Sequence, residues 1–453
     1  MINEQLKSII MIPGAGEHVY DTKIAYEADG SPINAHFGKK ADVLLSLDSL
    51  KQNYPNVENI GLVVGWFGDS TKGGKIHIAP KVEHKNTYKG DVWSVGSVTR
   101  KNAEQISLDD SGEPNWGGTP SDRSIVDLVV EMEGRGYNVM LYPMLFTDNE
   151  DKSWRGKITA KTKKDVDHFF NEYNKFIEHY AKLEYGGVKI KDHISSFIVG
   201  SEMEGLTKNS YAVDKFVELT ANVRKAVGAD VKLTYAANWS EYHDDGRGNH
   251  PLDKLFADKN IDFVGIDAYF PITDNKKQKD ITPEIIKHGW ESGIDFDYWR
   301  DDNGKKHKLD DPADAVKNIE HWWSHEHYDK NGKVSAWQPK MKPVVFTEFG
   351  FTSVDGTTNE PYKYYDPTTG GAGFPKGSAG LLDYDAQRMA MEATEEFWTD
   401  KSSKDGNEGL ASTRYAYSWD ARPIYHEHAS EYWGDHGDWQ YGHWLKPQDV
   451  YAG

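Results

Sequence analysis

The chain has 453 residues, enough for one large α/β barrel or for two or three average domains. Its formal net charge of −19 argues against a surface for nucleic acid or anionic membranes, and no apolar run is long enough to span a membrane. The absence of cysteine excludes disulfides, thiolate metal sites and a cysteine nucleophile. The first residues lack a signal-peptide pattern, so we expect cytoplasmic synthesis.

Short apolar or β-branched runs alternate with longer amphipathic stretches, a rhythm typical of βα units and a parallel sheet. Eight runs are predicted as strands, namely 8–13, 60–66, 138–145, 194–200, 232–237, 263–269, 343–347 and 414–419. The predicted helices cover 41–53, 121–136 with Ser121 as N-cap, 164–184, 213–227, 313–325 and 384–398.

Eight strands separated by helices are the count for a closed barrel. We therefore predict an α/β fold, a (β/α)8 TIM barrel that forms a single domain over 1–453. An open doubly wound sheet is the alternative, but Gly14-Ala15-Gly16 after the first strand is not the glycine fingerprint that such a sheet uses to bind nucleotides.

Long excursions interrupt this rhythm. They span 67–119, with an expected hairpin near 91–98, then 146–163, 271–311, read as a polar rim loop, and 350–380, before an aromatic tail over 423–453. Many of the 15 Trp and 25 Tyr stand in loop-like segments beside Gly, Asp and Asn. Such rings fit either a sugar-binding cleft or a large aromatic core.

Two glutamates, Glu202 and Glu348, follow the predicted fourth and seventh strands, on opposing arcs of the barrel. Active sites of such barrels lie at these carboxyl ends. Glycoside hydrolysis needs one protonated carboxyl for the leaving oxygen and one carboxylate that attacks or activates water. A single glutamate at a strand end more often caps a helix or pairs with arginine. Two together, with Tyr269 and Trp419 at neighbouring ends, favour a catalytic pair.

Other side chains at the strand ends are predicted to contact substrate: Trp66, Asp69, Ser201, Asn238, Trp239, Tyr269, Trp419, Asp420 and Arg422. Structural roles stay open for several of them. Asp69 can satisfy a turn, Asn238 can be a turn residue beside a packed Trp239, and Asp420 can pair with Arg422.

Some polar residues near the strand ends are predicted to be structural. Glu204 is expected to pair with a basic residue or cap a helix, and Asp267 to be a buried structural partner. The histidines are expected to be solvated loop residues: His243, His250, His426, His428, His436 and His443. No metal site and no cofactor are predicted, because the chain lacks a glycine-rich phosphate loop and these histidines are scattered among Gly and Asp.

Nine segments, in order along the chain, resemble the TIM-barrel-like domain of gene transfer agent and phage tail hub proteins. They are IPGAGEHVY (12–20), LVVGWFGD (62–69), GGTPSD (117–122), GSEMEGLT (200–207), YAANWSEY (235–242), FVGIDAY (263–269), FTEFG (346–350), WDARP (419–423) and GHWL (442–445). That family is similar to the clan A glycoside hydrolases. The resemblance implies a polysaccharide or oligosaccharide ligand, other tail proteins as partners, and assembly into a phage-like particle.

The resemblance also implies roles for individual residues. Glu202 matches the clan A acid/base, Glu348 the nucleophile, Tyr269 the tyrosine that contacts the nucleophile, and Trp419 the aromatic residue under the sugar. Ser201 stands where clan A enzymes usually have the asparagine that holds the sugar 2-hydroxyl. A serine reaches less far, so another group contacts the substrate or activity is weak or absent.

Two hypotheses follow. The first is a retaining glycosidase that acts on a cell-surface or extracellular polysaccharide. The second is a catalytically inactive structural or glycan-binding module of a phage-like tail hub.

Overall fold

The computed structural model of the chain describes residues 2–12, 16–36, 38–85, 92–149, 153–291, 298–300, 305–309, 311–363 and 373–421. The predicted site residue Arg422 and the predicted tail, 423–453, lie outside this set. Within it, no helix is long and apolar enough to cross a membrane.

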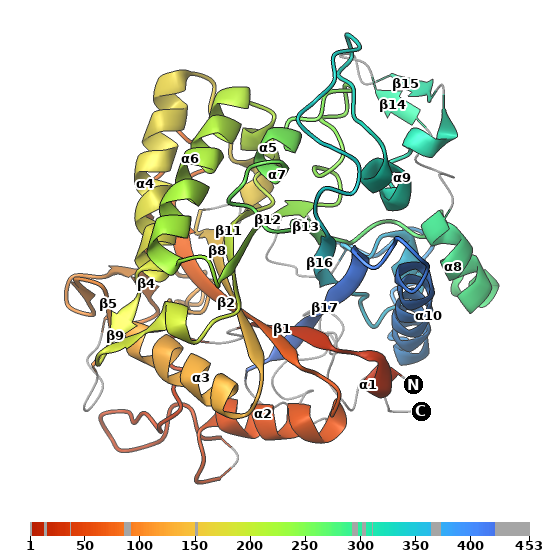
Figure 1. Cartoon of the computed structure of the whole chain (residues 1–453). Helices are drawn as coiled ribbons and strands as arrows, with labels where there is room; N and C mark the ends of the chain where they lie inside the picture. Colours follow the sequence, from red (N-terminus) through yellow and green to blue (C-terminus); the bar gives the residue numbers. More distant parts are fainter. Residues whose placement is uncertain are drawn as a thin grey trace.

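Eight parallel strands form a closed barrel at the centre of the molecule (Figure 1). They are β1 (Ser8–Ile12), β2 (Asn59–Gly68), β8 (Asn138–Thr147), β11 (Ser196–Ser201), β12 (Lys232–Asn238), β13 (Val264–Asp267), β16 (Val344–Phe349) and β17 (Leu410–Asp420). Neighbours in the ring follow chain order, and β1 pairs with both β2 and β17, which closes the barrel. The predicted (β/α)8 TIM barrel and its eight strands are confirmed.

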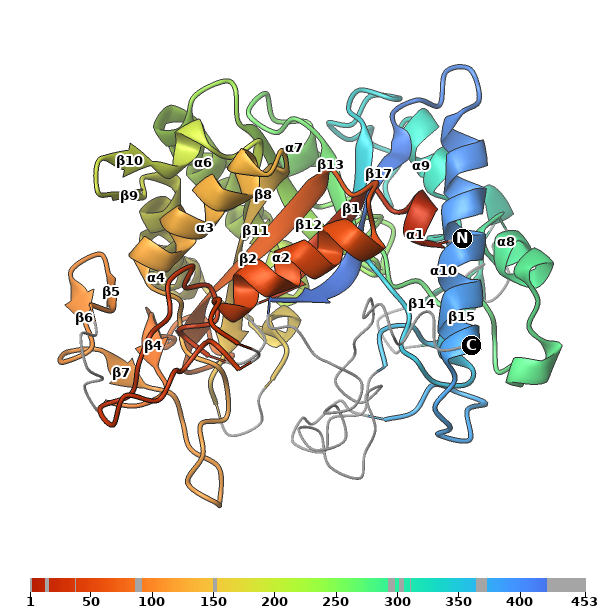
Figure 2. The same ribbon diagram turned by 90° about the horizontal axis from the view of Figure 1, so that it is seen from below.

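Helices form an outer layer around these strands (Figures 1 and 2). They are α1 (Ile2–Gln5), α2 (Asp42–Asn53), α3 (Asp122–Gly134), α4 (Lys163–Ala181), α5 (Glu204–Thr207), α6 (Ser210–Val227), α7 (Asp253–Phe256), α8 (Pro283–Glu291), α9 (Ile319–Ser324) and α10 (Tyr384–Ser402). The predicted N-cap of α3 is confirmed, because the Ser121 side chain accepts a hydrogen bond from the backbone N–H of Ser124.

Short strands decorate the excursions. β3 (Ile78–Ala79) pairs antiparallel with β2, β4 (Lys81–Val82) pairs with β7 (Glu104–Gln105), and β9 (Glu184–Tyr185) pairs with β10 (Val188–Lys189). The hairpin expected near 91–98 is present as β5 (Ser94–Val95) and β6 (Val98–Thr99).

The reading of 271–311 as a polar rim loop is wrong. This segment contains α8 and an antiparallel hairpin of β14 (Tyr298–Arg300) and β15 (Lys306–Lys308). Buried Ile286 and Trp290 lie one helical turn apart on α8, and Trp290 packs against Phe346 and Trp398 at ring centroid distances of 5.9 and 5.4 Å. The many charged residues around these two apolar side chains gave the segment the composition of a loop, so the helix was not predicted.

The helix predicted over 313–325 is also shorter than expected. A 3₁₀ turn at Pro312–Asp314 precedes it, and α9 begins only after Asn318. The Asn318 side chain accepts a hydrogen bond from the backbone N–H of His321, which is an N-cap and fixes the start of the helix.

Two apolar clusters make up the core. The smaller fills the inside of the barrel and comes from strands alone: Ile10, Val63, Met140, Tyr142, Met144, Ile198, Ala236 and Tyr415. The larger lies between the strands and the surrounding helices. Because strand side chains alternate between these clusters, a shift of one position decides whether a residue faces the axis or a helix.

Gly265 in β13 tests how closely neighbouring strands approach. A Cβ added there would lie 2.8 Å from the Tyr235 carbonyl oxygen and 3.0 Å from Cγ2 of Thr347. We expect Gly265→Ala to lower the free energy of unfolding by about 1–3 kcal/mol in urea denaturation, because the packed strands cannot separate to admit a methyl group.

Gly134 at the end of α3 is the matched control, since a Cβ there would meet nothing within 4 Å. Gly134→Ala should leave the stability unchanged or raise it by up to about 1 kcal/mol. Equal unfolding free energies for the two variants would contradict the close approach at Gly265.

Candidate active site

Glu202 follows β11 in a left-handed backbone conformation, with φ of +50°. Non-glycine residues rarely adopt it, and such strained positions cluster at functional sites. Three side chains hold the buried carboxylate. Oε2 accepts hydrogen bonds from Trp154 Nε1 at 2.8 Å and Arg155 Nη2 at 2.9 Å, and Oε1 accepts one from Asn238 Nδ2 at 2.6 Å.

The orientation of the Asn238 amide follows from its other partners. Its Oδ1 accepts hydrogen bonds from the backbone N–H of Ser240 at 3.0 Å and from the Ser240 hydroxyl at 2.9 Å. Because these contacts require an oxygen, the NH₂ group faces Glu202. The predicted site residue Asn238 thus contacts the candidate acid/base.

Glu348 lies on β16 and is buried. Its Oε2 accepts a hydrogen bond from the Tyr269 hydroxyl at 2.8 Å, whereas Oε1 has no hydrogen-bond partner among the described residues. Burial raises the pKa of Glu348 to about 7, the negative charge of Glu202 adds to this effect, and the Arg155 guanidinium opposes it. The structure therefore brings Glu202, Glu348 and Tyr269 into one electrostatic environment.

A third carboxyl group, Asp267 on β13, belongs to the same environment. It is fully buried and accepts hydrogen bonds from the Thr347 hydroxyl at 2.7 Å and the Tyr142 hydroxyl at 3.1 Å. Burial, followed by the charges of Glu348 and Glu202, raises its pKa well above the ordinary value. Its predicted role as a buried structural partner is confirmed.

Sequence reasoning missed Arg155, the buried cation of this site. Its Nε donates to both the carbonyl oxygen and the hydroxyl oxygen of Ser201, each at 3.1 Å, while Nη2 reaches Glu202. The Ser201 hydroxyl is thus a contact for Arg155. Arg155 and Trp154 come from the excursion over 146–163, and its nearness to the end of the fourth strand was not visible in the sequence.

Two predicted aromatic contacts face the helices instead. Trp66 packs on Phe176 and His179 of α4, at 5.3 and 5.5 Å between ring centroids. Trp66 therefore does not face the barrel axis, where a contact to substrate would require it. Side chains alternate along β2, and because Val63 belongs to the interior cluster, Trp66, three residues later, lies on the opposite face.

Trp419 likewise lies outside the barrel interior. Its Nε1 donates to the hydroxyl of Ser46 on α2 at 2.8 Å, and its ring meets edge-on the ring of Tyr54, the residue that follows α2. A register shift between β1 and β17 skips one residue just before Trp419 and changes the face on which it lies. Tyr417 packs against the interior cluster instead and lies 6.3 Å from the Tyr269 ring.

The remaining predicted residues have separate positions. Asp69 is exposed and accepts a hydrogen bond from the backbone N–H of His77 at 2.8 Å, which is the turn role left open for it. The Asp420 carbonyl accepts a hydrogen bond from the Ser46 hydroxyl. Half-buried Trp239 stacks on Tyr362, which is 39% exposed, so these two rings form an aromatic surface beside Asn238.

Two further expectations concern polar side chains. Glu204 forms the predicted ion pair with a basic residue, Lys208, at 2.6 Å. The expectation of solvated loop histidines is wrong for His243, which is buried, and for His250, which is half-buried. The other four histidines of that set lie outside the described residues.

Together, the closed barrel and the two buried glutamates at the carboxyl ends of β11 and β16 define a TIM barrel with a pair of carboxyl groups where such barrels have their active sites. The model of the GTA TIM-barrel-like domain matches residues 171–426, more than half of the chain. The protein belongs to this family, whose name refers to gene transfer agents.

Solved structures give the same fold. A GH113 beta-1,4-mannanase in complex is similar with a TM-score of 0.55 and 14% identity, covering 98% of this chain and 97% of that one. The GH113 beta-mannanase of Alicyclobacillus acidocaldarius, in complex with ManMIm, has a TM-score of 0.52 and 16% identity, with coverage of 98% and 95%. No protein with a curated description matches the sequence significantly.

The raised pKa of Glu348 makes stability depend on pH. The folded chain holds this proton more tightly than the unfolded chain, so the free energy of unfolding should fall as pH rises from about 4.5 to about 7. We expect the Glu348→Gln variant to lack this part of the loss, about 3 kcal/mol at most, in urea denaturation across that range. Parallel pH profiles for the two proteins would contradict a proton on Glu348.

Proposed function

We propose that this barrel hydrolyses glycosidic bonds of a cell-surface or extracellular polysaccharide with retention of configuration. Glu202 is the acid/base and Glu348 the nucleophile. The main support for these roles is that the carboxyl groups of Glu202 and Glu348, from opposing strands, share one buried site but have different hydrogen-bond partners. The fold shared with beta-1,4-mannanases supports a polysaccharide substrate and makes β-linked mannan a rational first one.

The contacts suit these roles. Tyr269 fixes Oε2 of Glu348, and the buried Oε1, which has no hydrogen-bond partner among the described residues, is the oxygen that would attack the anomeric carbon once substrate reaches it. As the bond to the leaving oxygen breaks, Glu202 gives that oxygen a proton. Water then attacks the glycosyl-Glu348 ester, and Glu202 takes a proton from it.

The position of the proton sets a condition on this reaction. In the free protein, Glu202 is ion-paired with Arg155, while the pKa of Glu348 is raised to about 7. Catalysis needs the opposite distribution, with Glu202 protonated and Glu348 ionised. Substrate binding must therefore weaken the contact between Glu202 and Arg155. If the ion pair persists in the complex, Glu202 stays ionised and its protonation limits the rate.

Arg155 also supports a second candidate function, a catalytically inactive glycan-binding module of a phage-like tail hub. It contacts both Oε2 of Glu202 and the Ser201 hydroxyl, which are the groups that an acid/base and a sugar contact would need. Binding would then rely on partly exposed rings, Trp154, Trp239 and Tyr362. The gene transfer agent name of the family fits partners among tail proteins.

Conservative substitution of the two glutamates tests the enzymatic proposal. On a polysaccharide panel that includes mannan, Glu202→Gln and Glu348→Gln should each lower the release of reducing ends by at least about 10²–10⁴-fold, because each removes one proton-transfer or nucleophilic step. NMR of the first product should show the anomeric configuration of the substrate.

Glu131→Gln is the matched control, since Glu131 pairs with Arg135 on the surface of α3 and should leave turnover unchanged. An unmodified protein that hydrolyses no member of the panel, or a product of inverted configuration, would count against the enzymatic proposal.

Glycan binding separates the two functions. In a binding module, Trp239→Ala should weaken the affinity for a glycan ligand about tenfold, measured by calorimetry, because it removes a stacking surface. Glu202→Gln and Glu348→Gln should leave that affinity unchanged. Binding that depends on both glutamates would favour the enzyme.

A further inference from the structure

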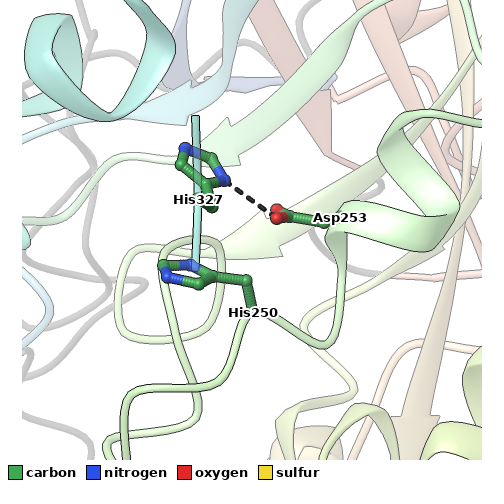
Figure 3. A group of neighbouring side chains, drawn as sticks. All are labelled: His250, Asp253 and His327. Atoms are coloured by element: carbon green, nitrogen blue, oxygen red, sulfur yellow. Dashed lines mark hydrogen bonds and ion pairs between the residues drawn. The ribbon is translucent and has the colours of Figure 1, made fainter. Parts of the chain in front are cut away.

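A second cluster of ionisable side chains lies outside the set that surrounds the two glutamates. It consists of His250, Asp253 and His327, and Figure 3 shows the carboxylate of Asp253 turned toward the His327 ring, with the His250 ring beside it. One potential ligand atom from each residue lies within 4.8 Å of the others. Asp253 opens α7, while His327 comes from the segment that follows α9, so the cluster joins two distant parts of the chain.

Each imidazole has one nitrogen fixed by a backbone carbonyl. His250 Nδ1 lies 2.5 Å from the His243 carbonyl oxygen, and His327 Nε2 lies 2.7 Å from the Trp322 carbonyl oxygen. A carbonyl only accepts, so these two nitrogens carry hydrogen. In neutral rings the other nitrogens, His250 Nε2 and His327 Nδ1, then carry lone pairs. Metal-binding histidines commonly have this second contact to a carbonyl.

The carboxylate of Asp253 faces one of those lone pairs. Its Oδ2 lies 2.9 Å from His327 Nδ1 and also accepts a hydrogen bond from the Ser335 hydroxyl. Its Oδ1 is buried and has no hydrogen-bond partner within the described part of the chain. A buried carboxylate oxygen without a partner is costly, and a lone pair opposite a carboxylate is repulsive unless a proton or a cation lies between them.

Aromatic rings hold the buried ligand in place. The His327 ring stacks on Trp337 with an interplanar angle of 3° and lies 4.9 Å from the Trp322 ring. The half-buried His250 ring stacks on the His327 ring, with 4.7 Å between the ring centroids and an interplanar angle of 25°. Packing thus positions His327 before any ion binds, which lowers the ordering cost for this ligand, whereas the His250 ring must tilt for its nitrogen to reach the same ion.

We propose that His250, Asp253 and His327 bind a divalent transition metal, with zinc as the best-fitting ion. Two imidazoles and one carboxylate are a donor set that suits zinc, whereas magnesium and calcium prefer oxygen ligands alone. A water molecule completes a tetrahedral site. The ion links the segment after α9 to α7, and its role is to stabilise the outer wall of the barrel.

Metal titration of the full chain tests this proposal. After removal of metal with a chelator, the protein should bind one equivalent of zinc in calorimetry and show a rise of a few degrees in Tm. Cobalt should bind at the same site and give the visible absorption bands of a tetrahedral complex. His250→Ala removes a half-buried ligand and should weaken zinc binding by more than about 100-fold, beyond the effect typical of a lost second contact.

His36→Ala is the matched control. His36 lies 2.6 Å from Asp42 in a histidine–carboxylate pair elsewhere in the protein, outside any three-residue ligand group found among the described residues. This variant should bind zinc as the unmodified chain does.

Three results would overturn the proposal: no zinc or cobalt binding by the unmodified chain, unchanged affinity in His250→Ala, or equal loss in His36→Ala. Asp253 and His327 are buried, and their substitution could unfold the protein. The titration of the unmodified chain and the His250→Ala variant decide the question without them.

Discussion

One buried guanidinium, that of Arg155, sets the chemistry of the site at the barrel's carboxyl end. Three carboxyl groups lie in its field: Glu202, Glu348 and Asp267. Buried charges need partners, and a single cation cannot balance three anions away from water. Arg155 forms its ion pair with Glu202, and the pKa of each of the other two carboxyl groups is raised. The site therefore retains protons at a pH where exposed carboxyl groups have lost theirs.

The geometry that delivers Arg155 depends on a small residue near the catalytic candidates. A Cβ on Gly205, three residues after Glu202, would collide with the carbonyl oxygens of Ile158 and Gly156. Glycine at this position lets the 3₁₀ turn Arg155–Lys157 lie directly against α5. Backbone packing thus brings the excursion with Arg155 against the strand end with Glu202 and holds the two charged groups in contact.

Sequence patterns predicted what depends on local periodicity and missed what depends on tertiary approach. Apolar runs located all eight strands, and the placement of Glu202 and Glu348 at strand ends followed from them. The positions of Trp66 and Trp419 do not follow from composition. For Trp66, the side of the sheet depends on which residues of β2 face the axis, and for Trp419 it depends on the register shift between β1 and β17. Arg155 was missed because its partner lies 47 residues away along the chain (155 to 202), with a helix between them.

The physical cost of the carboxyl groups bears on which function the barrel performs. The interior cluster is otherwise made of Ile, Val, Met, Ala and Tyr side chains that pack without charge. Replacing a buried ionic group with apolar residues of similar volume is often neutral or stabilising. A barrel used only as a structural module would gain stability by losing Glu348, whose Oε1 has no hydrogen-bond partner among the described residues. Together with the hydroxyl of Tyr269 on Oε2, this costly arrangement supports the enzymatic proposal more than a purely structural role.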